Sequence, residues 1–385
     1  MSNRVGVWLV GGRGSVATTA LTGAAAVGAG LAEPTGMVTM RPEFAEVGMP
    51  ALGDLVFGGH DVVETPLALR AARLVDDGVL PVGLPNALGA AIEAAESEQR
   101  PGITGHDART APRPALARIV SDLTSFKTRH DLQKLVVLNV SSTEAPVEPH
   151  PAHHDPALLM DALDRGLGVL PPSALYALAA IEVGAAFVDF TPSVGARLPA
   201  IEALAEAHEV PVAGSDGKTG ETFMKSALAP AFAARALKVR SWAGMNILGG
   251  GDGAALRDPD RVQSKLDSKG KLLEEILGYP VEAPIHIEDV RDMGEWKTAW
   301  DHIVFEGFLG VRMKLQFTWE GCDSTLAAPL LLDLMRLMAL ALERRERGVM
   351  ANLAFFFKDP AGCNEHSLHR QYEMLERWVA QKVTA

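Results

Sequence analysis

A glycine-rich turn between an apolar run and an expected helix has the composition of an anion-binding site. Residues 210–213 are apolar, and residues 214–222 read Gly-Ser-Asp-Gly-Lys-Thr-Gly-Glu-Thr. The first N–H groups of a helix lack partners within the helix and carry partial positive charge, so they bind phosphate readily. Lys218 and Lys225 add charge nearby, and Asp216 is a polar group at the rim. The stretch predicts a cradle for a small phosphorylated ligand, although an ordinary capped turn has the same composition.

A second glycine-rich turn, near the start of the chain, has the pattern of a dinucleotide-binding loop. Residues 5–10 form a continuous apolar run, as a buried parallel strand requires. Residues 11–17 read Gly-Gly-Arg-Gly-Ser-Val-Ala and lead into a helix that we expect to extend to about Leu31. Counted from Gly12, they give G-x-G-x-x-A between a strand and a helix, where glycines let the backbone approach a pyrophosphate. The residues expected to bind the cofactor are Gly12, Arg13, Gly14, Ser15 and Val16.

The residue that binds the adenine ribose is not settled by this pattern. Residues 38–40 are a plausible second strand, but Arg41 follows where an acidic residue is usual. An arginine there suits the 2′-phosphate of NADP, whereas an aspartate or glutamate bonds the 2′-hydroxyl of NAD. Glu33 and Asp61 are the other acidic candidates. The spacing alone leaves both cofactors open.

Several lysines have the chemistry to stabilise oxyanions or transfer protons. Lys265 and Lys269 are four residues apart and would share one helix face, which is also the pattern of a solvated helix. Lys297 lies in the segment Gly-Glu-Trp-Lys-Thr-Ala, and Lys358 follows the apolar run 349–357, which we expect to be a strand. Burial at a strand end lowers the pKa of a lysine toward neutrality, where it can act as an acid or a base.

The order of apolar runs and chain breakers predicts an α/β fold. Up to about residue 240, short apolar runs alternate with helical segments, which indicates a parallel sheet. Beyond that point several runs alternate apolar and polar residues, and two are joined by a glycine-bearing turn, as in an antiparallel pair. The expected strands are 5–10, 38–40, 135–140, 186–190 and 210–213, then 242–247, 284–287, 302–308 and 311–319. The expected helices include 155–167, which starts Asp-Pro, and 326–347.

Composition limits the possible partners. The chain has 385 residues, of which 48% are hydrophobic and 22% are charged, so it can bury a sizeable core. Its net charge of −12 argues against nucleic acid or an anionic membrane as a partner. The apolar stretch 326–342 carries Pro329, Asp333 and Arg336, so we expect a buried helix there and no membrane span. The histidines of the loop 144–154 are expected to bind no metal. The two cysteines match no zinc or redox motif, so we expect unpaired thiols in a reducing compartment and therefore a cytoplasmic protein.

Taken together, the motifs resemble those of one family, the myo-inositol-1-phosphate synthases, over most of the chain. None of the motifs is specific alone, but their number and order are highly specific. In chain order they are GGRGS (11–15), FGGHD (57–61), STEAP (142–146), PPSALYALAAIEVGAAFVDFTPS (171–193), GSDGKTGETFMKSAL (214–228), GGDG (250–253), SKLDSK (264–269), GEWKTA (294–299), CDSTLAAPLLLDL (322–334) and FFFKDP (355–360).

The resemblance implies an architecture and a reaction. Residues 1–222 and 327–385 would form a Rossmann-type domain with a parallel sheet, and residues 223–326 an inserted α+β domain for catalysis and oligomerisation, with a mostly antiparallel open sheet. The family works as a homotetramer with tightly held NAD. A sugar phosphate is oxidised at C5, enolised, closed by attack of C6 on the C1 aldehyde, and reduced again by the same cofactor.

The resemblance also implies roles for individual residues. Lys265, Lys297 and Lys358 belong around the substrate oxygens, where cations stabilise the enolate and aldolate. Asp61 becomes the expected ribose partner, which favours NAD over NADP. The residues expected at the substrate phosphate are Thr219, Gly220, Glu221, Thr222 and Lys269. Further contacts to the cofactor or the lysines are expected from Thr143, Asp216, Gly251, Asp252 and Asp323.

The chain departs from the family pattern near the expected site. The family typically has Asn-Asn-Asp-Gly at 250–253, Ser-Gly-Gln-Thr at 219–222 and Ser-Pro-Gln-Asn at 191–194, where this chain has GGDG, TGET and TPSV. Glu221 thus places a carboxylate beside the expected phosphate, which is unfavourable unless a lysine neutralises it. These changes predict that glucose 6-phosphate is a poorer substrate here than for typical family members.

Four functions therefore follow from the sequence, in decreasing order of expectation. The first is conversion of glucose 6-phosphate to an inositol phosphate. The second is the same chemistry on another sugar phosphate, such as fructose 6-phosphate, to give a five-membered cyclitol phosphate. The others are a regulator that binds NAD and sugar phosphate without turnover, and a dehydrogenase with net use of NAD.

Overall fold

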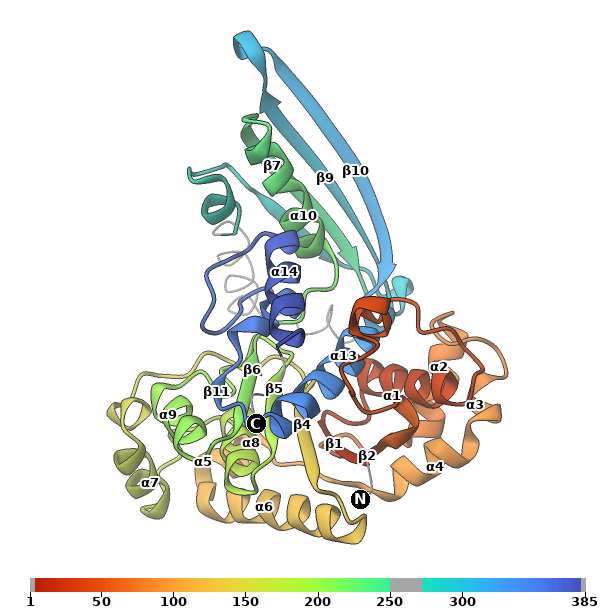
Figure 1. Cartoon of the computed structure of the whole chain (residues 1–385), viewed down its shortest axis with the longest axis vertical. Helices are drawn as coiled ribbons and strands as arrows, with labels where there is room; N and C mark the ends of the chain where they lie inside the picture. Colours follow the sequence, from red (N-terminus) through yellow and green to blue (C-terminus); the bar gives the residue numbers. More distant parts are fainter. Residues whose placement is uncertain (1–3, 250–271, 382–385) are drawn as a thin grey trace.

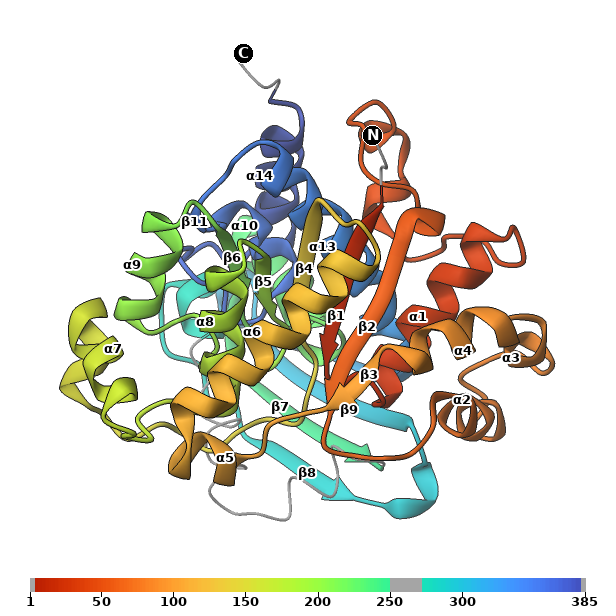
Figure 2. The ribbon, with the colours of Figure 1, turned by 90° about the horizontal axis from the view of Figure 1, so that it is seen from below.

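A seven-stranded parallel sheet lies at the centre of the larger part of the molecule, with helices around it (Figures 1 and 2). The computed structural model describes residues 4–249 and 272–381. The strand order is β11-β6-β5-β4-β1-β2-β3, with every neighbouring pair parallel. The strands are β1 (Val5–Val10), β2 (Leu55–Asp61), β3 (Gln99–Pro101), β4 (Lys134–Asn139), β5 (Ala186–Asp189), β6 (Pro211–Gly214) and β11 (Gly348–Val349).

Helices cover both faces of this sheet, which explains why its strands are apolar throughout. All six residues of β1 are buried, with Val7 and Leu9 in the core on one face and Trp8 and Val10 in the core on the other. The first face is covered mainly by α1 (Ser15–Gly28) and α13 (Asp323–Glu343), and the second by α6 (Pro112–Arg129), α8 (Pro172–Glu182) and α9 (Pro199–Ala207).

A second sheet extends away from the first and carries the long hairpin seen at the upper right of Figure 1. Its order is β10-β9-β7-β8, with antiparallel pairs except for β7 and β8. Helix α10 (Glu221–Ala234) covers one face through Ala229 and Phe232, whereas Met245 and Trp300, paired on the opposite face, are 41% and 42% exposed. The strands are β7 (Lys238–Leu248), β8 (Ile285–Asp289), β9 (Trp296–Glu306) and β10 (Arg312–Cys322).

Further helices of the described residues lie around these two sheets. Asp155 caps α7 as the Asp-Pro pair predicts, because its Oδ1 accepts hydrogen bonds from the backbone N–H groups of Ala157 and Leu158. The helices are α2 (Leu67–Asp76), α3 (Leu84–Ala87), α4 (Gly89–Ser97), α5 (Gly105–Thr110), α7 (Pro156–Asp164) and α14 (Leu368–Val379).

The predicted fold class is therefore confirmed, but two predicted strands are wrong. Residues 38–40 form a 3₁₀ helix because the N–H groups of Val38 and Thr39 donate to the carboxylate of Asp333 in α13, at 2.7 and 3.0 Å. The second strand of the sheet is instead β2, which ends at Asp61.

The second wrong strand is the apolar run 349–357. Pairing with β6 ends at Val349, and residues 351–356 form a 3₁₀ helix. Leu353 and Phe356 are fully buried in the core beside α13. A continuous apolar run shows burial on all sides, and it does not distinguish a strand from a buried helical turn.

Helix α13 is long and apolar enough to cross a membrane, but 72% of its apolar window is buried inside the protein. It packs against β4, β5 and β6 as a core helix. This placement agrees with the expectation from Pro329, Asp333 and Arg336, and the last two bind the loop around Thr39.

Candidate functional site

A cavity of about 660 Å³ opens at the carboxyl ends of the parallel strands. It lies where β1 and β4 adjoin, which is the point where the strand order reverses. Ligands of open α/β sheets bind at this kind of switch point. The cavity also reaches the second sheet, because Leu248 at the end of β7 and Lys297 at the start of β9 line it.

The predicted dinucleotide loop forms one wall of this cavity. Arg13, Gly14, Ser15 and Val16 line it, and Gly12 lies just behind, where its N–H donates to the carbonyl oxygen of His60. Within the described residues, no side chain caps the N-terminus of α1, so its first N–H groups face the cavity without a side-chain partner. A Cβ added to Gly14 would have only the carbonyl oxygen of Gly11 within 4 Å, at 3.2 Å. The loop thus has the uncapped donors and the missing side chain that a bound pyrophosphate requires.

Asp61 lies at the end of β2 beside this loop and lines the cavity. Its Oδ2 accepts a hydrogen bond of 2.8 Å from the N–H of Arg13, and its Oδ1 accepts one of 2.9 Å from the N–H of Val63. Each oxygen keeps a second lone pair for a ribose hydroxyl. Arg41, by contrast, pairs with Glu43 and lies over the ring of Tyr372, and neither Arg41 nor Glu33 lines the cavity. The geometry therefore fits NAD and not NADP.

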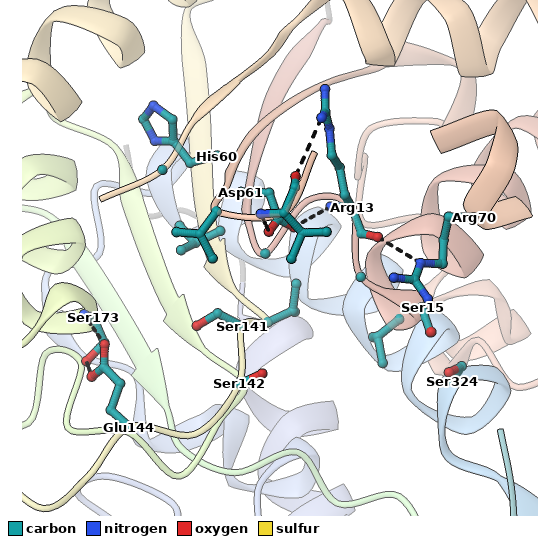
Figure 3. A pocket seen from close by; sticks show the side chains of 18 of the residues that line it. Arg13, Ser15, His60, Asp61, Arg70, Ser141, Ser142, Glu144, Ser173 and Ser324 are labelled. Atoms are coloured by element: carbon teal, nitrogen blue, oxygen red, sulfur yellow. Dashed lines mark hydrogen bonds between the residues drawn. The ribbon is translucent and has the colours of Figure 1, made fainter. Parts of the chain in front are cut away.

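The opposite wall is formed by the loop after β4 and the start of α8. Figure 3 shows Glu144 and Ser173 on one side of the cavity and Arg13 with Arg70 on the other. Glu144 accepts hydrogen bonds from the N–H and the hydroxyl of Ser173. Burial raises the pKa of Glu144 despite these two bonds. Thr143 does not line the cavity, whereas its neighbours Ser142 and Glu144 do.

The predicted anion cradle, residues 214–222, is fixed by backbone hydrogen bonds to the segment 356–361. The N–H of Ser215 donates to the carbonyl of Asp359, and the N–H of Lys358 donates to the carbonyl of Asp216, at 2.9 and 2.6 Å. Asp216 has a φ of +61°, which an aspartate tolerates better than most residues. This pairing brings Lys358 to Asp216 across 142 residues of sequence, with Nζ 2.8 Å from Oδ1.

A second lysine–aspartate pair lies at the junction of the cradle and the cavity. Lys297 Nζ is 3.1 Å from Asp323 Oδ2, and Thr219 donates to Asp323 Oδ1 at 3.1 Å. Gly220 permits this approach, because a Cβ there would be 3.2 Å from Lys297 Nζ. Burial acts to raise the pKa of Asp323, but the charges of Lys297 and Lys358 outweigh it and hold the pKa below its ordinary value. The two lysines thus act on one carboxylate.

Two lysines of this region, Lys218 in the cradle and Lys225 in α10, turn away from the cradle surface. Lys218 is 5% exposed and donates to Oε1 of Gln371 in α14, and burial lowers its pKa to about 7. Lys225 is 1% exposed and pairs with Glu221 at 2.7 Å. Both residues therefore hold the cradle from inside, and Glu221 has the lysine partner that its charge requires. Thr222, the last residue of the cradle, is also buried.

Sequence reasoning did not assign several residues that line the cavity. Glu295 accepts hydrogen bonds from the hydroxyls of Ser15 and Ser324, at 2.6 and 2.8 Å, and so joins the starts of α1 and α13. Glu144 and Glu295 both lie in motifs used for the family resemblance, which was the available signal. Four predicted site residues, Gly251, Asp252, Lys265 and Lys269, lie outside the described residues.

The chain is similar to known proteins over nearly its whole length. The myo-inositol-1-phosphate synthase family model matches residues 5–380. Inositol-3-phosphate synthase 1 of Bacteroides thetaiotaomicron is 33% identical, and the alignment covers 100% of this chain and 95% of the relative. The human inositol-3-phosphate synthase 1 is 31% identical, with 88% of this chain and 66% of the relative covered.

Solved structures show the same fold. Inositol-3-phosphate synthase from Caenorhabditis elegans has a TM-score of 0.87 at 23% identity, with 98% of this chain and 86% of that chain covered. A myo-inositol-1-phosphate synthase-related protein from Thermotoga maritima has a TM-score of 0.80 at 26% identity, with 99% and 100% covered. The chain therefore belongs to the myo-inositol-1-phosphate synthase family and is an NAD-binding enzyme of the isomerase type.

Proposed function

We propose that this carbocyclase converts glucose 6-phosphate to myo-inositol phosphate by internal oxidation, enolisation, aldol cyclisation and reduction. The observation that carries the proposal is that Lys297 lines the dinucleotide cavity beside Gly220, at the uncapped start of α10, and that Lys358 acts on the same carboxylate of Asp323. A sugar phosphate bound with its phosphate at α10 has its reacting carbons between these cations and the cofactor cavity.

The chain's own residues have separate tasks in this reaction. Gly14, Ser15 and Asp61 hold NAD, which supplies a hydride acceptor at the start and a hydride donor at the end. The N–H groups at the start of α10 bind the phosphate. Lys297 and Lys358 stabilise the enolate and aldolate oxygens as charge develops on them, and Asp323 and Asp216 orient the two ammonium groups. Lys265, Lys269, Gly251 and Asp252 are proposed to complete the site from outside the described residues.

The proposal is tested by incubating the protein with NAD and a panel of hexose phosphates and identifying the products by NMR. We expect an inositol phosphate from glucose 6-phosphate, with no net formation of NADH. A higher specificity constant for fructose 6-phosphate, with a five-membered cyclitol phosphate as product, would replace the proposed substrate. NAD binding without any product would identify a regulator, and stoichiometric NADH would identify a dehydrogenase.

We further propose a cytoplasmic homotetramer in which the inserted domain, residues 223–326, supplies the interface. Support comes from the open face of the second sheet, where Met245 and Trp300 are exposed side by side, and from the exposed hairpin tip at Phe308 and Leu309. Apolar sheet faces of this kind are normally covered. Light scattering at micromolar concentration should give four times the chain mass, and a monomer would contradict the proposal.

A further inference from the structure

The side chain of Glu221 lies in the protein interior and not on the surface of the anion cradle. Glu221 is the first residue of α10 and is 4% exposed. Its Oε1 is 2.7 Å from Nζ of Lys225, one helical turn later, and Lys225 is 1% exposed. Its Oε2 accepts a hydrogen bond of 3.1 Å from Nδ2 of Asn246 in β7. The carboxylate therefore links the first turn of α10 both to its own next turn and to a strand of the second sheet.

A second buried carboxylate lies in the same cluster. Asp301 in β9 is fully buried and accepts a hydrogen bond of 2.7 Å from Nε1 of Trp242, whose ring centroid is 5.9 Å from Lys225 Nζ. Gly244 separates the two carboxylates: a Cβ there would be 3.2 Å from Glu221 Oε1 and 3.6 Å from Asp301 Oδ1. Among the described residues, Lys225, Glu221 and Asp301 thus link α10, β7 and β9, and removing one member of a buried ion pair is costly because its partner stays buried without its nearest counter-charge.

We propose that Glu221 is a positioning residue, whose carboxylate fixes the phosphate-binding end of α10 against the end of β7 and does not touch the phosphate. The proposal rests on the proposed function only in taking the start of α10 as the phosphate site. Asn246 precedes Leu248, which lines the cavity, by two residues. The bond between Glu221 and Asn246 therefore sets the distance between the phosphate site and the cofactor cavity. Lys225 makes a carboxylate tolerable at this position.

Two possible roles of Glu221 predict opposite results for Glu221→Gln. If the carboxylate faced the phosphate, removing its charge would relieve repulsion and strengthen phosphate binding. If the carboxylate positions α10, the amide loses the 2.7 Å ion pair with Lys225 that ties the first turn of the helix to the second, the helix start shifts, and phosphate binding weakens. A second change, Lys225→Met, returns the group of Glu221, Asp301 and Lys225 to its wild-type net charge and should then recover binding, because a methionine fills the interior without requiring a counter-ion.

The experiment compares wild type with Glu221→Gln, Lys225→Met and the double variant. Asp161→Asn is the control, because Asp161 and Arg165 form an i,i+4 ion pair on α7 that is exposed to solvent. Inorganic phosphate binding by calorimetry and the Tm are measured for each protein. We expect each single variant to bind phosphate roughly tenfold more weakly and to melt at lower temperature. The double variant should recover at least half of both losses, and the control should change neither.

Three outcomes would overturn the inference. They are tighter phosphate binding by Glu221→Gln, single variants that match wild type in both measurements, and a wild type that binds no phosphate. The product panel tests the proposed function separately. A wild type that binds phosphate but forms no cyclitol would refute the carbocyclase and leave the binding and melting data to decide the role of Glu221.

Discussion

Replacing Lys297 by methionine should reduce turnover far more than stability. Methionine keeps most of the aliphatic chain and removes the ammonium group that lies 3.1 Å from Asp323. The side chains of Lys297 and Asp323 are 17% and 35% exposed, so both members of the pair are partly solvated. Ion pairs exposed to this extent contribute about 0–1 kcal/mol to folding. A loss of 1 kcal/mol lowers the Tm by about 2–4 °C in a protein of 150–250 residues and by less in a larger one, so this loss should lower the Tm by at most about 2 °C.

The expected loss in rate is much larger. A preorganised donor aimed at a developing oxyanion is worth about 3–4 kcal/mol, or roughly 10²–10³-fold in kcat. We would measure kcat from product formation at saturating glucose 6-phosphate and NAD, and the Tm of the same preparation. Lys314→Met is the control, because Lys314 is an exposed lysine of β10 that does not line the cavity.

One result would refute this reasoning. If Lys297→Met keeps the Tm of wild type and its kcat stays within tenfold, Lys297 stabilises no oxyanion. An equal loss of kcat in Lys314→Met would show that the effect is not specific to the site.

The pH dependence of stability gives a second check on the Lys297–Asp323 pair. The pKa of Asp323 is lowered in the folded state, so its contribution to stability is present above the unfolded pKa and is lost as the pH falls through the folded pKa. Loss of Lys297 should therefore lower stability at neutral pH and leave it unchanged in strong acid.

Three further predictions concern other parts of the site. Lys358→Met should lower kcat by about 10²–10³-fold while NAD affinity measured by calorimetry stays within a few-fold of wild type. Gly14→Val should abolish NAD binding in the same assay, because Gly14 lines the cavity and a valine side chain there would occupy the space that the pyrophosphate needs. Unchanged NAD affinity would contradict the assignment of the loop. Burial lowers the pKa of Lys218 to about 7, so between pH 7 and 10.5 the unfolded chain binds more protons and stability rises with pH. In thermal melts, the Tm of Lys218→Met should rise less with pH than the Tm of wild type, and the variant should exceed wild type most near pH 7. A slope of Tm against pH equal to that of wild type would show that Lys218 stays charged.

The sequence predicted elements whose determinants are local. The strand and loop at 5–16 and the Asp-Pro helix start at 155 needed no distant contact, and both are found in the structure. Residues 38–40 were predicted wrongly because the partner of their N–H groups, Asp333, is almost 300 residues away. The strand that takes their place, β2, ends at Asp61, which only the family resemblance had favoured.

The candidate site shows the same limit. Its motifs gave the positions of Lys297 and Lys358, and the structure adds which carboxylate each lysine meets. Lys218 and Lys225 were predicted to add positive charge to the anion cradle, but their side chains lie in the protein interior. Direction of a side chain depends on packing between elements, here α10 against β7 and α14, and spacing along the chain contains no information on that packing.

The pairing of residues 214–218 with 356–361 also constrains how the protein is made. Strand β6 has β11 as a neighbour, and Asp216 meets Lys358 only after some 140 further residues have been added. Contacts this distant in sequence form late in synthesis. The cover that α13 gives to one face of β1 and β4 likewise waits for residues 323–343, so the sheet core and the lysine pair are both completed near the end of synthesis. Interrupted translation would leave fragments that carry the NAD loop and have no means of turning over sugar phosphate.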